Sequence, residues 1–396
     1  MRGLRILFIS QYFPPDITAA SFRVAETAAW LERMGWSVVV LTATPHRARA
    51  ESGTAEPNAR IRIVRAPILP IGDRGGLWYV LHYLSFMLTS LLWGALRAPW
   101  KADIVLASSP PLFVGVSGWI LSKLKRGQFV LDVRDLWPDS AAAVGQLSRS
   151  GLLARAGRRL ERFLYSRAVQ VICVSRPMRE VIISRSDPEK DVVVVYNAVD
   201  TELVGGVREQ EPKPEAELQT IAYVGNVGRA QGLEILMTAA ERFPDVEFRI
   251  IGGGVCRAAL ESLVTEQHLA NVGFFGPVPK SEALAHMRAS SALFLHVLDD
   301  PVFATTIPSK LFDYLLADRP ILYGIRGEGA QLLDSLPGNV RFLPGNSDSL
   351  IEAIERLRTS YTARRGAARK NSKSLAQFDR AMVTRRLAEA LERLVG

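Results

Sequence analysis

The segments RILFIS at residues 5–10 and SVVVLT at residues 37–42 decide the fold of this chain. Both are short, continuously apolar in the middle and rich in Val, Ile and Leu. A strand covered on both faces has this pattern, whereas a half-exposed strand alternates apolar and polar residues. The two segments therefore predict strands of a parallel sheet with helices on both faces.

Further apolar runs of the same kind alternate with helical patterns along the first half of the chain. The runs lie at residues 61–65, 103–107, 128–133, 170–174 and 192–196, and the helical patterns at 19–34, 77–96, 112–124, 152–165 and 177–184. Repeated strand and helix predicts a doubly wound α/β domain, here residues 1–200. Its ligands are expected at the carboxyl ends of the strands.

The alternation stops and then resumes. Residues 201–217, TELVGGVREQEPKPEAE, combine paired glycines, prolines and many charges, which is typical of a linker. Strand patterns at 220–224, 247–251, 271–275, 292–296, 320–323 and 340–342 then predict a second doubly wound domain, residues 218–374. Residues 375–396 predict an amphipathic helix that packs back on the first domain. The expected fold is α/β, with two facing Rossmann-like domains and a cleft between them.

Composition limits the possible classes of protein. The 396 residues carry a net charge of +9, which suits anionic partners such as phosphates or acidic lipids. Only two cysteines occur, so a disulfide framework is not expected. The basic residues are dispersed without an aromatic-basic motif, so we do not expect nucleic acid as a partner. The short apolar run at residues 6–9 does not resemble a signal peptide.

The window DDPVFATTIPSKLFDYLLADRP, residues 299–320, predicts a helix N-terminus that can bind an anion. Pro308 suits the first turn of a helix that begins in the 305–307 loop, and Ile307 offers no capping oxygen to the first N–H groups. Lys310 lies where the helix dipole disfavours a cation, which indicates a nearby negative group. Asp313 follows on the same face and can accept hydrogen bonds from hydroxyls. The alternative is an ordinary amphipathic helix with a solvated Lys and Asp.

Residues 77–96, LWYVLHYLSFMLTSLLWGAL, carry no full charge and are long enough to span a bilayer. Spanning would place strands of one sheet on opposite sides of the membrane, so a covering helix of the first domain is one interpretation. The aromatic residues and the flanking basic residues also fit a helix that docks on a membrane surface, with His82, Ser85, Thr89 and Arg97 on one polar stripe. Both interpretations remain open here.

The whole chain resembles the family 4 glycosyltransferases of the GT-B fold, especially bacterial members that build O-antigen, capsule or other surface polysaccharides. The resemblance rests on the order and spacing of these motifs: QYFPPD, LHYLSF, SSPPLFVG, LDVRDLWPDS, ERFLYSRA, VYNAVD, YVGNVGRAQGL, IPSKLFDYL and GIRGEGAQLL. It implies a retaining transferase that moves a sugar from a nucleoside-diphosphate sugar, with UDP as the expected nucleotide, to a polyprenyl-diphosphate-linked acceptor. The acceptor would lie at the inner face of the cytoplasmic membrane, where a cytoplasmic enzyme would bind peripherally.

The resemblance assigns the donor side to the second domain. Of the family's glutamate pair, the second acid falls on Asp313, which would hold the ribose, and the first falls on Thr305, for which Asp299 or Asp300 is a substitute. The family's diphosphate-binding Arg and Lys fall on Asn226 and Gln231. The backbone of residues 225–228 and the cations Arg229 and Lys310, with Arg326 as a further candidate, are expected to take that role. The complete predicted donor set is Gly225, Asn226, Gly228, Arg229, Gly253, Val278, Thr306, Ser309, Lys310 and Asp313, with the base against residues 252–254 and 277–279.

The acceptor side is assigned to the first domain. The family's His-Asp pair reads Arg134-Asp135 here, and Arg134 stays protonated, so it is no general base. Asp135 is predicted to polarise the acceptor hydroxyl or to hold the donor sugar, with Asp139 in reserve and Asp16 as a further acceptor contact. An Arg134–Asp135 pair that caps the next helix is the structural alternative. His296 is expected to be structural.

Helix N-termini and cations, rather than a metal ion or other cofactor, would meet the charge of the leaving diphosphate. No residue is an evident covalent nucleophile. A nucleotide-sugar epimerase of the same fold and a non-catalytic, membrane-associated binding subunit are the alternative functions.

Overall fold

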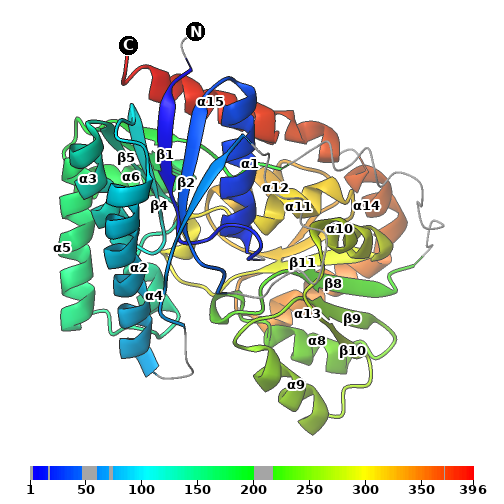
Figure 1. Cartoon of the computed structure of the whole chain (residues 1–396). Helices are drawn as coiled ribbons and strands as arrows, with labels where there is room; N and C mark the ends of the chain where they lie inside the picture. The colour runs from blue at the N-terminus through cyan, green and yellow to red at the C-terminus, as the bar shows by residue number, and fades with distance from the viewer. Residues whose placement is uncertain (1–2, 17, 47–59, 71–74, 200–216, 370) are drawn as a thin grey trace. The chain divides into compact units, whose positions relative to one another are not determined.

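The computed structural model describes residues 3–16, 18–46, 60–70, 75–199, 217–369 and 371–396. The chain divides into two compact units, of which the first comprises residues 1–198 and 380–396 and the second residues 199–379 (Figure 1). Most of the predicted linker, residues 201–216, lies outside the described residues. Each unit is described by itself, so the predicted cleft between them stays a prediction.

The first unit is built on one parallel sheet. Its strands are β1 (Arg5–Ile9), β2 (Ser37–Ala43), β3 (Arg62–Ala66), β4 (Ile104–Ser109), β5 (Gln128–Val133), β6 (Gln170–Cys173) and β7 (Val192–Val194). They are ordered β3-β2-β1-β4-β5-β6-β7. Its helices are α1 (Ala19–Arg33), α2 (Gly75–Arg97), α3 (Phe113–Lys125), α4 (Asp139–Ala143), α5 (Leu152–Arg167), α6 (Arg176–Arg185) and α15 (Arg380–Glu392). The order reverses between β1 and β4, which is where doubly wound sheets bind ligands.

Both faces of this sheet are apolar because helices cover both. Ile6 and Phe8 of β1 belong to the core cluster that includes Val24 of α1 and Leu387 of α15. On the opposite face, Gly94 of α2 packs against Leu121 of α3 and Leu41 of β2, where a Cβ would lie 2.6 Å and 2.9 Å from their methyl carbons. Figure 1 shows α15 beside α1, within the same unit. The predicted C-terminal helix is shorter than expected, because residues 371–378 form the 3₁₀ segment η3 in the second unit.

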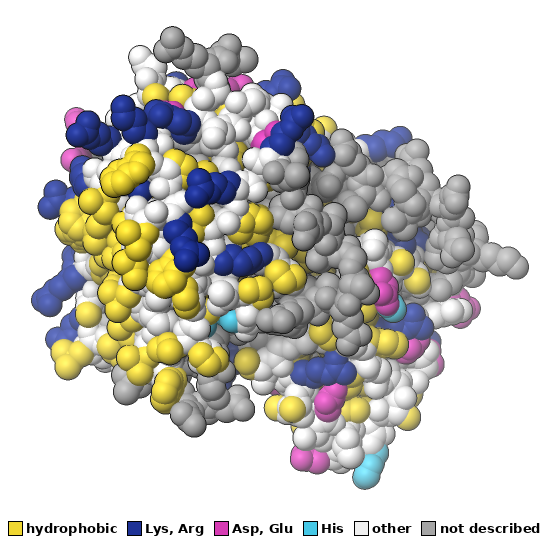
Figure 2. All heavy atoms as spheres, viewed as in Figure 1, with side chains coloured by type: hydrophobic (Ala, Val, Ile, Leu, Met, Phe, Trp, Pro, Cys, Tyr) yellow, Lys and Arg dark blue, Asp and Glu magenta, His cyan; other side chains and the backbone are white. Residues whose placement is uncertain are grey.

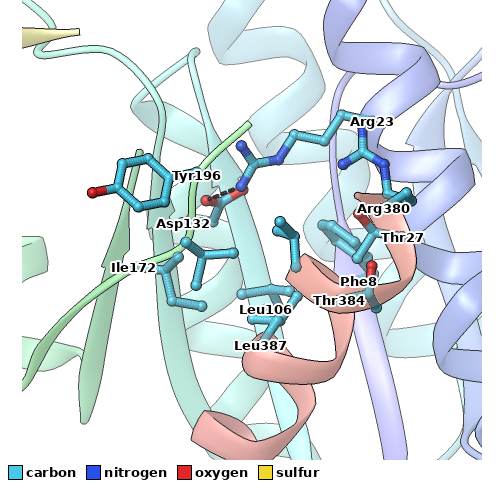
Figure 3. Close-up of a pocket in the computed structure, with 12 residues that line it drawn as sticks. Phe8, Arg23, Thr27, Leu106, Asp132, Ile172, Tyr196, Arg380, Thr384 and Leu387 are labelled. Atoms are coloured by element: carbon cyan, nitrogen blue, oxygen red, sulfur yellow. Dashed lines mark hydrogen bonds and ion pairs between the residues drawn. The ribbon is translucent and has the colours of Figure 1, made fainter. Parts of the chain in front are cut away.

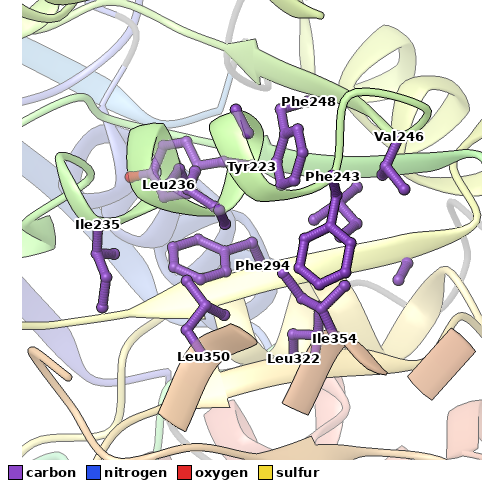
Figure 4. Packing of buried hydrophobic residues seen from close by; sticks show 14 of the residues in the cluster. Tyr223, Ile235, Leu236, Phe243, Val246, Phe248, Phe294, Leu322, Leu350 and Ile354 are labelled. Atoms are coloured by element: carbon purple, nitrogen blue, oxygen red, sulfur yellow. The ribbon is translucent and has the colours of Figure 1, made fainter. Parts of the chain in front are cut away.

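The second unit has a six-stranded parallel sheet of the Rossmann order. Its strands are β8 (Thr220–Val224), β9 (Glu247–Ile251), β10 (Val272–Phe275), β11 (Ala292–His296), β12 (Ile321–Gly324) and β13 (Val340–Arg341), ordered β10-β9-β8-β11-β12-β13. Its helices are α8 (Ile235–Arg242), α9 (Arg257–Glu266), α10 (Lys280–Ala289), α11 (Lys310–Leu316), α12 (Glu328–Asp334), α13 (Ser347–Thr359) and α14 (Tyr361–Ala368), with 3₁₀ turns η1 (Arg229–Gln231), η2 (Phe303–Thr305) and η3 (Asn371–Phe378). Figure 4 shows its core, where Phe243, Phe294 and Leu350 pack together.

The apolar helix α2 has one buried and one exposed face. Phe86 is fully buried, whereas Leu88 and Leu96 are 61% and 74% exposed. Arg97 is exposed, but most of the predicted polar stripe does not face water: Thr89 Oγ1 donates to Pro67 O at 2.6 Å, and His82 is buried. These side chains fix the segment between β3 and α2. Among the described helices, none combines the length and the apolarity needed to cross a bilayer.

Candidate functional site

Two glycine-containing loops pair at the carboxyl edge of the second sheet. The loop of residues 225–228 follows β8, and the loop of residues 252–254 follows β9. Gly225 N donates to Ile251 O at 2.9 Å, and Val227 N donates to Gly253 O at 2.8 Å. Backbone pairing of the two strands thus continues into their loops, at the point where the sheet order reverses.

The glycines at 252 and 254 are required by this pairing. Gly252 has φ +134° and Gly254 has φ +156°, a region that side chains disfavour. A Cβ at either position would also collide with the backbone of the 225–228 loop. The three glycines are therefore more than a tight turn, because they let two backbones approach each other.

The predicted cradle of four open backbone donors at residues 225–228 is not present. The N–H groups of Gly225 and Val227 are used by the neighbouring loop, and Gly228 N donates to Gln231 Oε1 at 3.1 Å. The glycines here serve loop packing, so most of the positive charge for an anion has to come from side chains.

Lys310, the first residue of α11, supplies such a charge. Its Nζ lies 4.1 Å from the centroid of the Tyr223 ring and donates a hydrogen bond to the Tyr223 hydroxyl, which donates in turn to Asn226 O. The Lys310 side chain also packs against Gly225, where a Cβ would lie 3.2 Å from Nζ. Burial lowers the pKa of Lys310 to about 7, against the opposite effect of Asp313. Lys310 thus lies at the paired loops, as the sequence predicted.

Tyr314 fixes the helix that carries this lysine. Its hydroxyl accepts a hydrogen bond from Val224 N at 2.8 Å and donates one to Val224 O at 3.1 Å. Both groups belong to the last residue of β8, and Tyr314 is fully buried. Because Lys310 and Tyr314 are four residues apart on one helix face, this contact sets the position of the lysine.

The start of α11 differs in detail from the prediction. The helix begins at Lys310 with Ser309 as its N-cap, so Pro308 precedes the helix, and the Ser309 hydroxyl makes no capping hydrogen bond. Thr306 lies in the preceding turn, where its hydroxyl donates to Phe303 O at 3.3 Å. Asp313 lies one turn after Lys310 and is partly exposed.

The remaining predicted donor residues line the same edge. Asn226 and Arg229 are exposed, and Arg229 opens the turn η1. Gly253 has room for contact, since a Cβ there would meet only the Pro277 ring, at 3.6 Å. Val278 follows in the loop after β10 and is partly exposed. These residues surround the two paired loops, where the base and the diphosphate were predicted.

Two further predicted groups are occupied by each other. Arg326 Nε and Nη2 bind the two carboxylate oxygens of Asp299 at 2.5 and 2.8 Å. In this structure Arg326 is therefore not available as a phosphate ligand, and Asp299 is not available as the substitute acid. His296 is structural as expected: its Nδ1 donates to Gln231 O at 2.7 Å, and its Nε2 accepts from Gly345 N at 2.9 Å.

In the first unit, Arg134 and Asp135 follow β5 at the carboxyl edge. Burial raises the pKa of the Asp135 carboxyl, while hydrogen bonds from the Ser140 hydroxyl and Leu136 N oppose the change. Arg134 Nη2 donates to Asn197 Oδ1 at 3.4 Å. The two charges attract each other, but no ion pair joins these neighbours within the described part of the chain. The next helix, α4, has Pro138 as its N-cap and no side-chain cap, so the predicted capping pair is not seen.

Asp16 is turned inward. It is 2% exposed, accepts a hydrogen bond from His46 N at 3.0 Å, and has Oδ2 3.4 Å from His46 Nδ1. His46 Nε2 lies 3.4 Å from Gln11 Nε2, which lies 3.0 Å from His82 Nε2. This placement does not favour the predicted direct contact of Asp16 with an acceptor, because Asp16 orients a histidine instead.

Asp139 belongs to a group of charges that ties α4, α5 and α6 together. Arg185 Nη2 binds Asp139 Oδ2 at 2.6 Å, and Arg185 Nη1 binds Glu161 Oε2 at 3.1 Å. Tyr165 donates to Glu161 Oε1 at 2.8 Å, and Arg158 lies 3.4 Å from Asp139. The reserve role of Asp139 toward an acceptor is therefore not favoured.

Sequence reasoning missed Tyr223, Tyr314 and the cluster of Gln11, His46 and His82. Tyr223 and Tyr314 looked like core residues, since each stands in an apolar run. The four-residue spacing of Lys310 and Tyr314 was the available sign that Tyr314 lies on the same helix face as the lysine. Nothing local connects Gln11, His46 and His82, because three separate segments bring them together.

Comparison with known proteins gives consistent results. Residues 18–198 match the glycosyl transferase 4-like domain family. The chain is 26% identical over 374 residues to WcaI of Escherichia coli (strain K12), a putative colanic acid biosynthesis glycosyl transferase, with 89% of this chain and 91% of that protein covered. It is 26% identical over 239 residues to WbjE of Pseudomonas aeruginosa, a probable glycosyltransferase, with 59% of each covered.

Solved structures share the fold. Sucrose-phosphate synthase from Thermosynechococcus elongatus has a TM-score of 0.76 at 18% identity, with 98% of both chains covered. HepE of Anabaena, solved with UDP and glucose, has a TM-score of 0.71 at 18% identity, with 98% of this chain and 99% of that chain covered. These comparisons confirm the α/β GT-B fold class and the resemblance to family 4 glycosyltransferases.

Proposed function

We propose that this chain, whose residues 18–198 belong to the glycosyl transferase 4-like domain family, is a retaining glycosyltransferase of bacterial surface-polysaccharide synthesis. The second unit would bind a nucleoside-diphosphate sugar, with UDP as the expected nucleotide. The first unit would bind a polyprenyl-diphosphate-linked acceptor. HepE, a protein of similar fold, has been solved with UDP-glucose, and WcaI and WbjE are described as glycosyltransferases, which supports this assignment.

The position of Lys310 is the observation that carries the proposal. It brings a cation to the two paired loops at the reversal point of the second sheet. The Lys310 ammonium contacts the ring and the hydroxyl of Tyr223, and Asp313 lies one helical turn away. A diphosphate would complete this site, and exposed Arg229 would add a second cation from the other side of the 225–228 loop.

The other donor roles follow from the same geometry. Asp313 would accept hydrogen bonds from the ribose hydroxyls, and Thr306 and Ser309 would offer polar groups beside the phosphates. The base would lie against Gly253 and Val278. These assignments use the donor residues that the sequence predicted.

Chemistry at the anomeric carbon then needs little covalent help from the protein. The bond from C1 to the diphosphate oxygen breaks, the bond from C1 to the acceptor oxygen forms on the same face, and the departing diphosphate takes the acceptor proton. Lys310 and Arg229 stabilise the negative charge that develops on the leaving group. Asp135, whose pKa burial raises, would orient the acceptor hydroxyl or the donor sugar. The proposal requires no metal ion.

The first unit carries a surface suited to a membrane-bound acceptor. Leu88, Leu92, Leu96, Trp100 and Leu124 are each more than half exposed, and we call them the apolar patch. Figure 2 shows hydrophobic side chains gathered over the region of α2, with Lys and Arg around them. Exposed Arg97, Lys101, Lys123 and Arg126 adjoin the patch in sequence.

One buried lysine holds the end of this surface in place. Lys125 Nζ donates to Ala95 O at 3.0 Å and to Ala98 O at 3.1 Å, which satisfies carbonyls at the end of α2. The same Nζ lies 5.3 Å from the Trp100 ring. We assign the apolar patch to the inner face of the cytoplasmic membrane, where leucines and tryptophan enter the interface and the cations meet anionic headgroups. The protein would thus be cytoplasmic and peripherally bound.

The test supplies the purified protein with a panel of UDP-sugars, in the presence of EDTA, with and without polyprenyl-diphosphate-linked acceptors. Lipid-linked product and UDP release that depend on the acceptor are expected. Asp135→Ala and Lys310→Ala should lower turnover by about 100-fold or more with the fold preserved. Conversion of the nucleotide-sugar without an acceptor would instead favour an epimerase. Donor binding without turnover on any acceptor would favour a binding subunit.

A further inference from the structure

Three arginines meet at the carboxyl edge of the first sheet, and two of them are neutralised. Arg23 of α1 binds Asp132 Oδ1 at 3.1 Å, and both side chains are less than a tenth exposed. Arg380, the first residue of α15, binds Glu26 Oε2 at 2.8 Å and donates to Ala198 O at 2.7 Å. Each of these guanidinium groups therefore has a carboxylate as a counter-ion.

Arg134 is the third, and it has no such counter-ion among the described residues. Within the described residues, its side chain donates one hydrogen bond, from Nη2 to Asn197 Oδ1 at 3.4 Å, an oxygen that Arg23 Nη1 already binds at 2.7 Å. Arg134 Nε is buried without a hydrogen-bond partner. A guanidinium has five N–H donors, and most of those on Arg134 make no hydrogen bond to the described residues.

The nearby carboxylates are engaged elsewhere. Asp132 Oδ2 accepts from Ser108 Oγ at 2.9 Å while Oδ1 faces Arg23, and Asp135 accepts from Ser140 and Leu136. Burial, followed by the charge of Arg23, lowers the pKa of Arg134 below its usual range, although the charges of Asp132 and Asp135 act in the opposite direction. A guanidinium nevertheless stays charged at neutral pH. A mostly buried cation that has no ion-pair partner of its own, and whose Nε makes no hydrogen bond, is unfavourable for folding alone.

The cavity beside this cluster of arginines is too small to hold an anion such as phosphate. It lies between the sheet and helices α1 and α15, and Figure 3 shows Arg23, Arg380 and Thr384 around it. Its volume is about 10 Å³, room for about one water molecule, and Thr384 Oγ1 is a buried hydroxyl without a partner there. An anion could therefore reach Arg134 only from the partly exposed side of the arginine.

We propose that Arg134 binds a phosphate oxygen pair of a substrate diphosphate through its planar fork. The proposal rests on the proposed function, which supplies diphosphates on both substrates. An arginine suits this task because its parallel N–H groups match two phosphate oxygens. It also explains why an arginine can replace the histidine that the family resemblance predicts at this position, since its role is to hold charge and not to move a proton.

The experiment uses the full chain and two titrations by calorimetry. Inorganic pyrophosphate is titrated into protein saturated with UDP, and UDP is titrated into free protein. Arg134→Gln should weaken one of the two by about 10- to 100-fold. The exposed Arg385→Gln on α15 is the matched control and should change neither. Loss confined to pyrophosphate identifies an acceptor diphosphate, and loss confined to UDP identifies the donor diphosphate.

Two outcomes overturn the inference. One is an Arg134→Gln protein that binds both ligands as the wild type does. The other is a fall of several degrees in the melting temperature of ligand-free Arg134→Gln together with unchanged binding by Arg134→Lys, which would make the residue structural. Removal of an unneutralised charge should leave the melting temperature equal or higher. If wild-type protein transfers no sugar but needs Arg134 for pyrophosphate, the proposed function fails and the anion site stands.

Discussion

Lys310 and Tyr223 are joined by a cation–π contact of 4.1 Å and by a hydrogen bond from the ammonium to the phenol hydroxyl. The two residues are far apart in the sequence and meet because α11 follows β11, the neighbour of β8. The ring shields one side of the ammonium from water. Burial accordingly lowers the pKa of Lys310 to about 7, and this value makes its charge sensitive to pH in the neutral range.

The first prediction concerns the pH dependence of UDP binding. A diphosphate favours the protonated lysine, so UDP affinity should fall as pH rises from about 7 to 9, by at most about tenfold per pH unit. Terminal phosphate ionisation lies near pH 6 and does not interfere. Calorimetry in two buffers of different ionisation enthalpy should show proton uptake on binding at pH 8. Lys310→Met should bind weakly, without this dependence; a flat wild-type profile would refute the assignment.

Stability should respond to the same lysine with the opposite sign. The folded pKa lies below the unfolded value of about 10.4, so the unfolded chain binds more protons between these values. The contribution of Lys310 to unfolding free energy therefore rises with pH over that window. The difference in melting temperature between the wild type and Lys310→Met, measured from pH 7 to 9, isolates this contribution of Lys310. No change in this difference with pH would contradict the lowered pKa.

Tyr314→Phe is predicted to loosen α11. The variant leaves Val224 N and Val224 O without the hydroxyl that binds both, at a cost of about 1–3 kcal/mol for a buried donor and acceptor. UDP affinity should fall as well, because Lys310 lies on the same helix face. Thermal unfolding and UDP titration measure the two effects. Normal stability and normal UDP binding together would show that Tyr314 does not position Lys310.

The three adjacent glycines provide an internally controlled test. Gly252→Ala and Gly254→Ala should each cost about 2 kcal/mol or more and weaken UDP binding, because the new Cβ collides with the 225–228 loop at a positive φ. Gly253→Ala is the control, since its Cβ makes only ordinary contact with Pro277. Melting temperatures and UDP affinities of the three variants check this order. Equal effects at all three positions would disprove the loop-pairing argument.

Membrane docking predicts selective effects of charge at the apolar patch. Leu96→Glu and Trp100→Glu should each weaken sedimentation with vesicles that contain phosphatidylglycerol by about tenfold or more, since each removes an apolar side chain from the interface. Wild-type binding should also fall as salt rises. Leu343→Glu, an exposed leucine of the second unit, is the control. Equal binding by all four proteins would exclude the patch as the docking surface.

Much of the fold could be predicted from local patterns. Runs such as residues 5–10 and 37–42 are apolar on both faces, so they specify covered parallel strands wherever they occur. Chain order then leaves few arrangements, because crossover connections between parallel strands have one hand. The start of α11 was misplaced by a few residues, since Pro308 is compatible with positions both inside and just before a first turn.

The site was only partly predictable. Lys310 and Asp313 belong to one helix turn, so their spacing alone indicated a shared face. The inward pairing of Asp16 with His46 and of Asp139 with Arg185 gave no local signal, because an acidic residue at a strand end looks the same whether it faces water or another segment. The amides of Gly225 and Val227 are not open for a similar reason, since Ile251 O and Gly253 O accept their hydrogen bonds.

By itself, the sequence determined the two wound sheets and the presence of a cation and a carboxylate at the start of α11, because periodicity and turn chemistry act between near neighbours. The tertiary structure alone decided which charges are neutralised. Arg23 and Asp132 are 109 positions apart, yet they pair, while Arg134 has no ion-pair partner of its own among the described residues. The order of the strands in the sheet brings such distant residues together, and local sequence patterns give no sign of this pairing.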